Sequence, residues 1–329
     1  MREVKIRGVR VWDVPALLRV AQTSFAEEMS LFSLRPGKIW ARMLVFALIY
    51  CTQRLRRRPK FKFFVAEVEG RAVGGTMVEW HRDYAYISAV MVHPDFRRQG
   101  IGRALLSQAL DAAFKFDAKR AVLHVRADNL PARKLYESLG FRPFETRLTL
   151  LWEAPRLPQG KPLPPGFTLR KTSPWDERIL AIRREAQGPA AAEVYGPPLA
   201  PRGLPRLFPS FQTAFLLLRD GVPVGAATIR GGAAAELRVY LSPQEEGAEA
   251  AKSFLLQLLE HEIGLKSKRR FFMSRLLSRG SPPNGKAVGR GKKVLLRTSG
   301  ESAQIIEAAK SLGFREAMRE WGMVLKRSS

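Results

Sequence analysis

One segment of the chain joins an apolar run to an amphipathic run through a short basic turn that holds two glycines. It spans residues 90–106 and reads VMVHPDFRRQGIGRALL. The apolar run favours a strand, and the later apolar residues, which recur three or four places apart, favour a helix. A strand that passes into a helix through so short a turn is typical of chains that contain both helices and strands, which places this chain in the α/β class.

The turn has the composition of an anion-binding site. Gly100 and Gly102 leave the backbone accessible, because glycine has no side chain and adopts positive φ without strain. The first N–H groups of a helix have no partner within it, and Arg97, Arg98 and Arg103 add positive charge. The spacing matches neither a dinucleotide-binding turn nor a P-loop. We therefore predict a pyrophosphate cradle of a different type.

The segment that follows repeats the order of strand, turn and helix. Residues 121–125 read AVLHV, which is typical of a buried strand. Asn129 is suited to cap the next helix, and Gly140 is suited to end it.

These segments carry R-x-x-G-x-G after V-x-V-x-P, and then LHVRADN followed by LYESLGF. They resemble the GCN5-related N-acetyltransferases, the GNAT family, over about residues 2–152. Within that family the chain resembles the ribosomal-protein and N-terminal acetyltransferases. The resemblance implies a mixed, mostly antiparallel sheet flanked by helices, acetyl-CoA as cosubstrate and an amine as acceptor.

The resemblance also implies roles for individual residues. The strand before the turn would pair with the pantetheine arm, the turn would hold the pyrophosphate, and Asn129 would contact the CoA arm. The residues assigned to acetyl-CoA are Val90, Met91, Val92, Arg97, Arg98, Gln99, Gly100, Ile101, Gly102, Arg103 and Asn129.

For catalysis, Tyr136 matches the general acid near the sulfur, and a packed aromatic is the alternative. His124 matches the position of a base that pairs through water with a tyrosine on the neighbouring strand, here Tyr86. A neutral imidazole accepts a proton near pH 7. The alternative is a structural histidine whose ring nitrogens hydrogen-bond to the backbone. Glu79 is a second candidate base. Because no nucleophile such as cysteine lies in these motifs, we expect direct attack in a ternary complex.

The chain repeats itself at long range. Ser138–Arg142 recurs without change as Ser311–Arg315, and Phe167–Arg170 is similar to Val4–Arg7. A proline-rich stretch separates the halves. We predict two tandem GNAT-like domains, with a catalytic domain over 1–153, a linker over 154–166 and a degenerate domain over 167–329.

The second copy lacks the features of the cradle. If Pro94 and Pro243 correspond, Glu249 replaces Gly100 and Ala251 replaces Gly102. Acidic side chains at that turn would repel a pyrophosphate. We therefore expect acetyl-CoA to bind only the first copy.

Composition limits the other functions. A single cysteine excludes an intramolecular disulfide, and four histidines without ligand spacing give no sign of a metal site. The formal net charge of +26 predicts weak, non-specific contact with nucleic acid or another anionic surface. Charged residues in the first seven positions argue against a signal peptide, and no segment is long and apolar enough to span a bilayer, so we expect a cytoplasmic protein.

Several questions stay open at this level. The acceptor is not identified, and the last hairpin, at Glu145–Thr149, has no tyrosine pair of the kind that grips a peptide in N-terminal acetyltransferases. Transfer of another acyl group, a small-molecule acceptor and a CoA-sensing protein that binds RNA or ribosomes are alternatives. An apolar helix near residues 39–51 could line the acceptor pocket, contact lipid, pack on the second domain or fill core. The sequence does not determine the oligomeric state.

Overall fold

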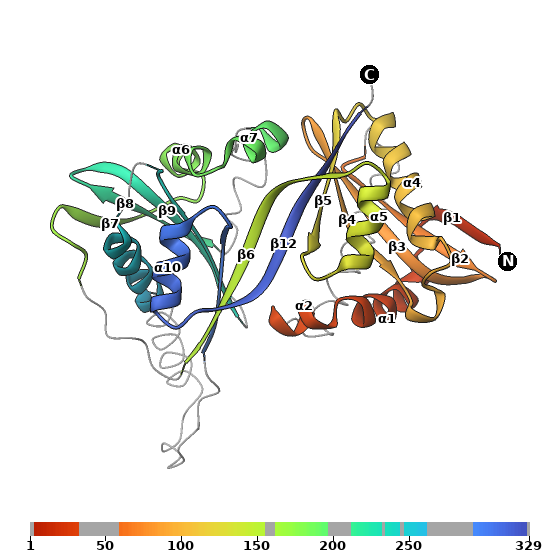
Figure 1. Cartoon of the computed structure of the whole chain (residues 1–329), viewed down its shortest axis with the longest axis horizontal. Helices are drawn as coiled ribbons and strands as arrows, with labels where there is room; N and C mark the ends of the chain where they lie inside the picture. The colour runs from red at the N-terminus through yellow and green to blue at the C-terminus, as the bar shows by residue number, and fades with distance from the viewer. Residues whose placement is uncertain are drawn as a thin grey trace, which may run out of the picture. The chain divides into compact units, whose positions relative to one another are not determined.

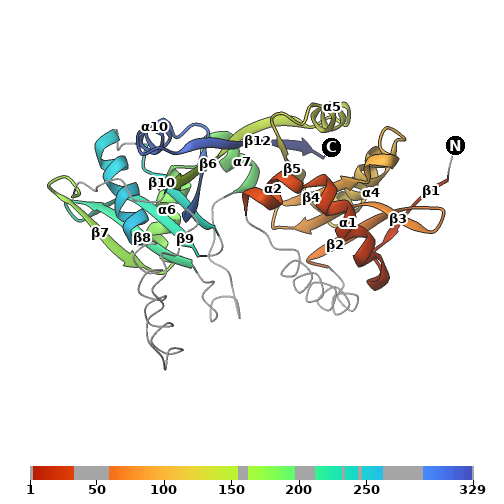
Figure 2. The ribbon, with the colours of Figure 1, turned by 90° about the horizontal axis from the view of Figure 1, so that it is seen from below.

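The computed structural model describes residues 3–32, 59–154, 162–196, 212–231, 234–243, 247–261 and 292–327 (Figures 1 and 2). The apolar segment at 39–51 and most of the proline-rich linker lie outside these residues. The chain forms two compact units, and neither is continuous in sequence. Unit 1 comprises Met1–Glu145, Glu193–Gly196 and Glu320–Ser329, and unit 2 comprises Thr146–Ala192 and Pro197–Arg319.

Unit 1 contains a mixed sheet in the order β1-β2-β3-β4-β5-β12. Neighbouring strands are antiparallel except for β4 and β5, which are parallel. The strands are β1 (Val4–Gly8), β2 (Phe61–Val68), β3 (Arg71–Trp80), β4 (Tyr84–Val92), β5 (Arg120–Arg126) and the later part of β12 (Arg315–Lys326).

Helices cover both faces of this sheet because its central strands are apolar on both sides. Along β2, Phe64 and Ala66 pack in the core that contains the helices α4 (Ile101–Lys115) and α5 (Leu130–Ser138). The alternate residues Phe63 and Val65 pack with Leu17 of α1, on the other face. Burying each large apolar side chain stabilises the fold by roughly 1.5–3 kcal/mol. The other helical elements in the described part of unit 1 are η1 (Val11–Asp13), α1 (Val14–Ser24), α2 (Ala26–Leu31) and η2 (Pro94–Phe96).

Unit 2 has the same plan. Its strand order is β6-β11-β10-β9-β8-β7, and β10 and β11 form the parallel pair. The strands are β6 (Arg142–Ala154), β7 (Phe167–Thr172), β8 (Gln212–Arg219), β9 (Val222–Arg230), β10 (Ala235–Leu241) and β11 (Lys292–Ser299). The helices are α6 (Glu177–Glu185), α7 (Pro189–Tyr195), whose last residues belong to unit 1, a helix over 248–261, and α10 (Ala303–Ser311).

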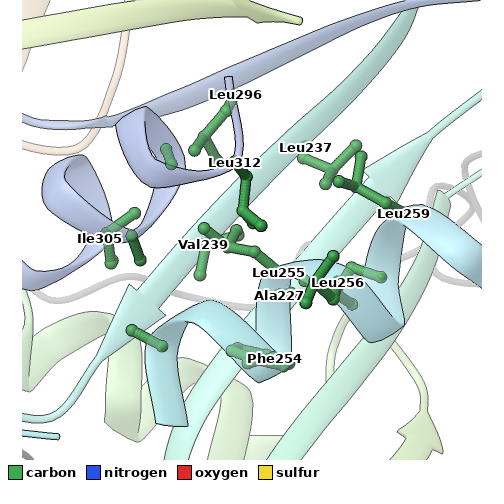
Figure 3. Close-up of a cluster of buried hydrophobic side chains, with 14 of the residues drawn as sticks. Ala227, Leu237, Val239, Phe254, Leu255, Leu256, Leu259, Leu296, Ile305 and Leu312 are labelled. Atoms are coloured by element: carbon green, nitrogen blue, oxygen red, sulfur yellow. The ribbon is translucent and has the colours of Figure 1, made fainter. Parts of the chain in front are cut away.

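The main core of unit 2 lies between its sheet and two of these helices. Figure 3 shows Leu255 of the helix over 248–261 and Leu312, just after α10, directed toward Val239 of β10. The opposite face packs against α6 through Ile179 and Ile182. The mixed α/β class and the tandem arrangement of two similar folds, both predicted from the sequence, are confirmed.

The last strand of the first copy of the repeat lies in the sheet of unit 2, and the last strand of the second copy lies in the sheet of unit 1. β6 follows the first copy but pairs with β11 over Arg147–Ala154, within unit 2. β12 ends the second copy but pairs with β5 over Glu320–Lys326, within unit 1. The predicted boundary at residue 153 separates the two copies in chain order. The compact units instead exchange equivalent strands, as two subunits do in a domain swap, but here within one chain.

Among the described residues, no three or more His, Cys, Asp or Glu side chains are grouped in a way that could hold a metal ion. A search of the same residues for a helix with the length and apolar character needed to cross a membrane finds none.

Candidate active site in unit 1

The sheet of unit 1 opens between its two parallel strands. β4 and β5 pair only where Tyr84–Tyr86 meet Arg120–Val122. Farther along β4, Met91 and Val92 pair with β3 at Gly75 and Gly74, after an irregularity at which Ala89 adopts a φ of +52°. The backbone of Val90–Val92 therefore has β3 on one side and, within the described part of the sheet, no pairing with β5 on the other. An extended ligand can add to such an edge as a strand does.

The glycine-containing turn lies at the end of β4. Gly100 is the N-cap residue of α4 and has a φ of +79°, a conformation that favours glycine. Side chains of the turn fasten its backbone: Arg97 Nε donates to the Val92 carbonyl at 3.1 Å, and Gln99 Nε2 donates to the Asp95 carbonyl at 3.3 Å. Arg97, Arg98, Gln99 and Gly100 are all exposed. An accessible helix N-terminus flanked by arginines is suited to hold a pyrophosphate.

Four other residues that the sequence assigns to acetyl-CoA have structural partners. A Cβ at Gly102 would lie 3.3 Å from Leu135 Cδ2, so this glycine allows α4 and α5 to approach closely. Ile101 is only 1% exposed and lies in the core. Arg103 donates to Ser138 Oγ at 2.7 Å, and Asn129 Oδ1 accepts from the Ala132 N–H at 3.2 Å as the cap of α5. These four residues therefore pack or cap helices, whereas the turn at residues 97–100 is exposed.

Tyr86 and His124 are in direct contact. The Tyr86 Oη lies 3.0 Å from His124 Nδ1, a hydrogen-bond distance without the intervening water that the resemblance implies. The two residues come from β4 and β5, close to the point where these strands separate. The side chain of His124 is 5% exposed, whereas Tyr86 is half-buried.

Two residues that sequence reasoning did not assign to the site complete it. Glu145 Oε1 lies 2.9 Å from His124 Nε2. Tyr195 Oη donates to Glu145 Oε1 at 2.7 Å and lies 3.2 Å from His124 Nε2. Glu145 occurs in the hairpin noted for its missing tyrosines, and Tyr195 lies beyond the linker, in a stretch that the sequence assigns to the other domain. No local pattern places either residue beside His124.

A glycine makes room for Glu145. Gly322 of β12 is the cross-strand partner of His124. A Cβ on Gly322 would lie 2.5 Å from Glu145 Cγ, 2.9 Å from its Oε1 and 3.0 Å from Phe144 Cε1. Real Cβ atoms do not make contacts this short, so the Glu145 side chain fills the space that any other residue at position 322 would need.

Tyr136 lies on α5, on the opposite face of the sheet from α1. It is 6% exposed, and its ring centroid lies 6.1 Å from that of Phe141. Burial raises the pKa of Tyr136 to about 12, and the Tyr86 phenol adds a smaller contribution in the same direction. The phenol is therefore protonated at neutral pH, as a proton donor must be. Glu79, the second candidate base, is the cross-strand partner of Tyr86 on β3.

The family comparison matches the part of the chain that contains the glycine turn, His124 and Tyr136. The model of the Acetyltransferase (GNAT) family matches residues 27–141. The chain is 32% identical over 138 residues to a putative [ribosomal protein bS18]-alanine N-acetyltransferase from Bacillus subtilis, covering 42% of this chain and 80% of that protein. It is 27% identical over 154 residues to an N-alpha-acetyltransferase from Sulfurisphaera tokodaii, covering 43% and 81%.

Solved structures resemble the whole chain in fold. A GCN5-related N-acetyltransferase from Sphaerobacter thermophilus aligns with a TM-score of 0.60 at 17% identity, covering 98% of this chain and 95% of that one. A tandem GNAT protein from the clavulanic acid biosynthesis pathway aligns with a TM-score of 0.55 at 18% identity, covering 99% and 100%.

Proposed function

Because this chain belongs to the GNAT family of acetyl-CoA-dependent N-acetyltransferases, we propose that unit 1 catalyses direct transfer of the acetyl group to a primary amine. Donor and acceptor are bound together, and no acyl-enzyme forms. The observation that carries this proposal is the contact between Tyr86 and His124 at the place where β4 and β5 separate.

The donor is held along β4 and at the turn that follows. The pantetheine arm pairs with the backbone of Val90–Val92, which has no partner on β5 in the described sheet. The pyrophosphate lies at the N-terminus of α4, beside Arg97 and Arg98. Gly100 supplies the left-handed backbone at that point.

The acceptor arrives as an ammonium and must lose a proton before its nitrogen can attack the thioester carbonyl. Tyr86 and His124 receive this proton. The new C–N bond forms as the C–S bond breaks, and Tyr136 donates a proton to the leaving thiolate. The second proton of the amine nitrogen then restores Tyr136. One proton leaves through His124, so the overall reaction is balanced.

The first acceptor class to test is the α-amino group of a polypeptide. The names of the relatives from Bacillus subtilis and Sulfurisphaera tokodaii point to this class. Purified full-length protein, acetyl-CoA and a set of peptides and small amines are incubated, and free CoA thiol and acetylated product are measured. We expect an acetylated amine with some member of the set. His124→Ala and Tyr136→Phe should lower turnover while acetyl-CoA affinity persists.

Two results would contradict the proposal. Wild-type turnover by both variants with a true acceptor would exclude the assigned base and acid. Unchanged acetyl-CoA affinity in a variant with a bulky residue at Gly100 would exclude the assigned cradle. The contact with nucleic acid predicted from the net charge remains a separate prediction.

A further inference from the structure

We propose that Glu145 is a positioning residue that fixes the orientation and the proton of His124, and that Gly322 is required because it houses the Glu145 side chain. This inference rests on the proposed function, in which His124 is the base. Its evidence is a set of contacts that meet around one imidazole, from β4, β5, β6, α7 and β12.

The hydrogen-bond partners determine which nitrogen of His124 carries the proton. An ionised carboxylate only accepts hydrogen bonds. Glu145 Oε1 already accepts the Tyr195 hydroxyl at 2.7 Å and lies 2.9 Å from His124 Nε2, so Nε2 must donate to it. Nδ1 is then the unprotonated nitrogen, and it accepts the hydroxyl proton of Tyr86 at 3.0 Å.

Charge supports the same arrangement. Among the described residues, the polar groups within hydrogen-bond distance of the imidazole include the Tyr86 phenol from β4, Glu145 from β6 and the Tyr195 phenol from α7. Among these three groups, Glu145 is the one that is a carboxylic acid. When Nδ1 takes a proton, the imidazolium lies 2.9 Å from a carboxylate in a site where water is largely excluded.

The backbone explains why Glu145 reaches His124. Gly322 is the residue opposite His124 on β12, and its missing side chain leaves the space that Glu145 Cγ and Oε1 occupy. Aromatic rings hold the far side of this space. Tyr195 packs edge-on against Phe144 and against Tyr84, with ring centroids 5.5 and 5.3 Å apart.

The arrangement also determines the path of the proton. Both ring nitrogens of His124 have partners, since Nδ1 lies 3.0 Å from Tyr86 Oη and Nε2 lies 2.9 Å from Glu145 Oε1. The acceptor ammonium therefore gives its proton to the Tyr86 oxygen while the Tyr86 hydroxyl proton moves to His124 Nδ1. No bond other than these O–H and N–H bonds changes, and Glu145 stays ionised throughout.

The first test observes the imidazole directly, without turnover. The chain has four histidines, so long-range nitrogen-15 spectra of the full-length protein can be assigned with a His124→Ala variant. At a pH where the ring is neutral, we expect His124 in the Nε2–H form. In Glu145→Ala the preference should weaken or reverse. An Nδ1–H form in the wild type, or an unchanged form in Glu145→Ala, would overturn the proposal.

The second test uses the cross-strand glycine. We expect Gly322→Ala to lower kcat about as much as Glu145→Ala, by roughly 10- to 100-fold, which is less than the loss expected when the base itself is removed. The same Gly322→Ala change made in the Glu145→Ala background should have a smaller effect, because the two shortest contacts, both with Glu145, are gone and only Phe144 Cε1, at 3.0 Å, has to shift. If Gly322→Ala lowers kcat by the same factor with and without Glu145, Gly322 does not act through the Glu145 side chain, and the proposal is contradicted.

Glu145→Gln keeps the shape of the side chain and is the variant of choice if alanine impairs folding. Its amide oxygen still accepts from Nε2–H, but the charge is lost, so the acid limb of the kcat/KM profile should move to lower pH. A limb that stays in place would contradict the proposal. Glu193→Gln is the matched control, since this exposed carboxylate two residues before Tyr195 pairs with Lys326 at 2.8 Å.

The two kinds of failure can be told apart. If no amine is acetylated, the proposed function fails, while the nitrogen-15 spectra still report whether Glu145 orders His124. If acetylation occurs but neither the spectra nor the pH profile respond to Glu145, only the positioning role fails.

Discussion

In unit 1, β5 carries His124 opposite Gly322 of β12, whereas in unit 2, β11 carries Arg297 opposite Thr149 of β6. The repeat that aligns Ser138–Arg142 with Ser311–Arg315 also aligns these two pairs. Arg297 Nη1 lies 3.6 Å from Glu236 Oε1, and Thr149 is 1% exposed. The same scaffold thus holds a histidine beside a glycine whose space Glu145 fills in unit 1, and an arginine opposite a buried threonine in unit 2.

The turn proposed to hold the acetyl-CoA pyrophosphate in unit 1 also differs from its counterpart in unit 2. The helix after this turn starts at Gly100 in unit 1 and at Gly247 in unit 2, because the carbonyls of these glycines accept from the Ala104 and Ala251 N–H groups at 3.0 Å. Glu249, which is exposed in the first turn of the unit 2 helix, therefore matches Gly102 and not Gly100, the match expected from the prolines. An acidic residue in a first helical turn stabilises that helix but repels a bound anion. The comparison therefore favours a single donor site per chain, and exchanging residues between the units is the direct way to challenge it.

The largest expected effect comes from giving the unit 1 turn an acidic residue of the kind found in the first helical turn of unit 2. In Gly100→Glu, a left-handed backbone costs roughly 1–2 kcal/mol and the carboxylate adds repulsion, so acetyl-CoA affinity should fall by at least about 10-fold. Calorimetry measures the change. Glu249→Gly in unit 2 is the control, and it should leave one acetyl-CoA bound per chain. A second bound molecule would break the comparison.

The next effect concerns the base. His124→Arg places the residue of unit 2 in unit 1, and a guanidinium cannot accept a proton at neutral pH. Turnover should fall by about 100-fold or more, the usual contribution of general-base catalysis, while acetyl-CoA affinity is retained. The reciprocal change Arg297→His should leave turnover unaltered. If it alters turnover as strongly, catalysis is not confined to unit 1.

A smaller effect is expected from Tyr195→Phe. The change removes a hydroxyl that donates to Glu145 at 2.7 Å but keeps the ring that packs on Phe144 and Tyr84. The loss of one such bond, worth about 0.5–1.5 kcal/mol, should lower kcat by roughly two- to tenfold. Steady-state kinetics measure this, with Tyr240→Phe in unit 2 as the control. An unchanged kcat would show that the hydroxyl does not support Glu145.

A final prediction compares stability rather than activity. Asp13 in unit 1 and Asp176 in unit 2 hold the same place after the first strand of each copy. Burial opposes ionisation of Asp13, but Arg7, at 2.7 and 2.9 Å, and the Arg10 N–H outweigh it and hold the pKa of Asp13 below its usual value. A lowered pKa in the folded state contributes stability above about pH 4, and this contribution is lost as the pH falls through the folded value.

Asp13→Asn should therefore destabilise unit 1 by about 1–3 kcal/mol at pH 7 and by less at pH 3, because Arg7 is 10% exposed and loses a partner. Urea unfolding at the two pH values measures this. Arg178 and Thr172 also lower the pKa of Asp176, but the Arg178 partner is 43% exposed, so Asp176→Asn should cost less. Equal losses in the two variants would contradict the role assigned to burial.

The local features of this protein could be read from its sequence. The strand, turn and helix at 90–106, the cap at Asn129 and the positions of Tyr86, His124 and Tyr136 depend on short-range periodicity and on residues close in the chain. The long repeat likewise revealed two copies of one fold. These properties follow from which backbone conformations and which buried faces a short segment can adopt, so the sequence by itself determined them.

Only the tertiary structure decided how the site is completed. Glu145, Tyr195 and Gly322 come from three segments separated by the linker and by the second copy, and the strand exchange brings them to one imidazole. β6 and β12 are equivalent in pattern, so apolar periodicity alone does not specify which of them pairs with β5. That choice depends on packing over long range, and it determines both the space beside His124 and the side chain that fills it.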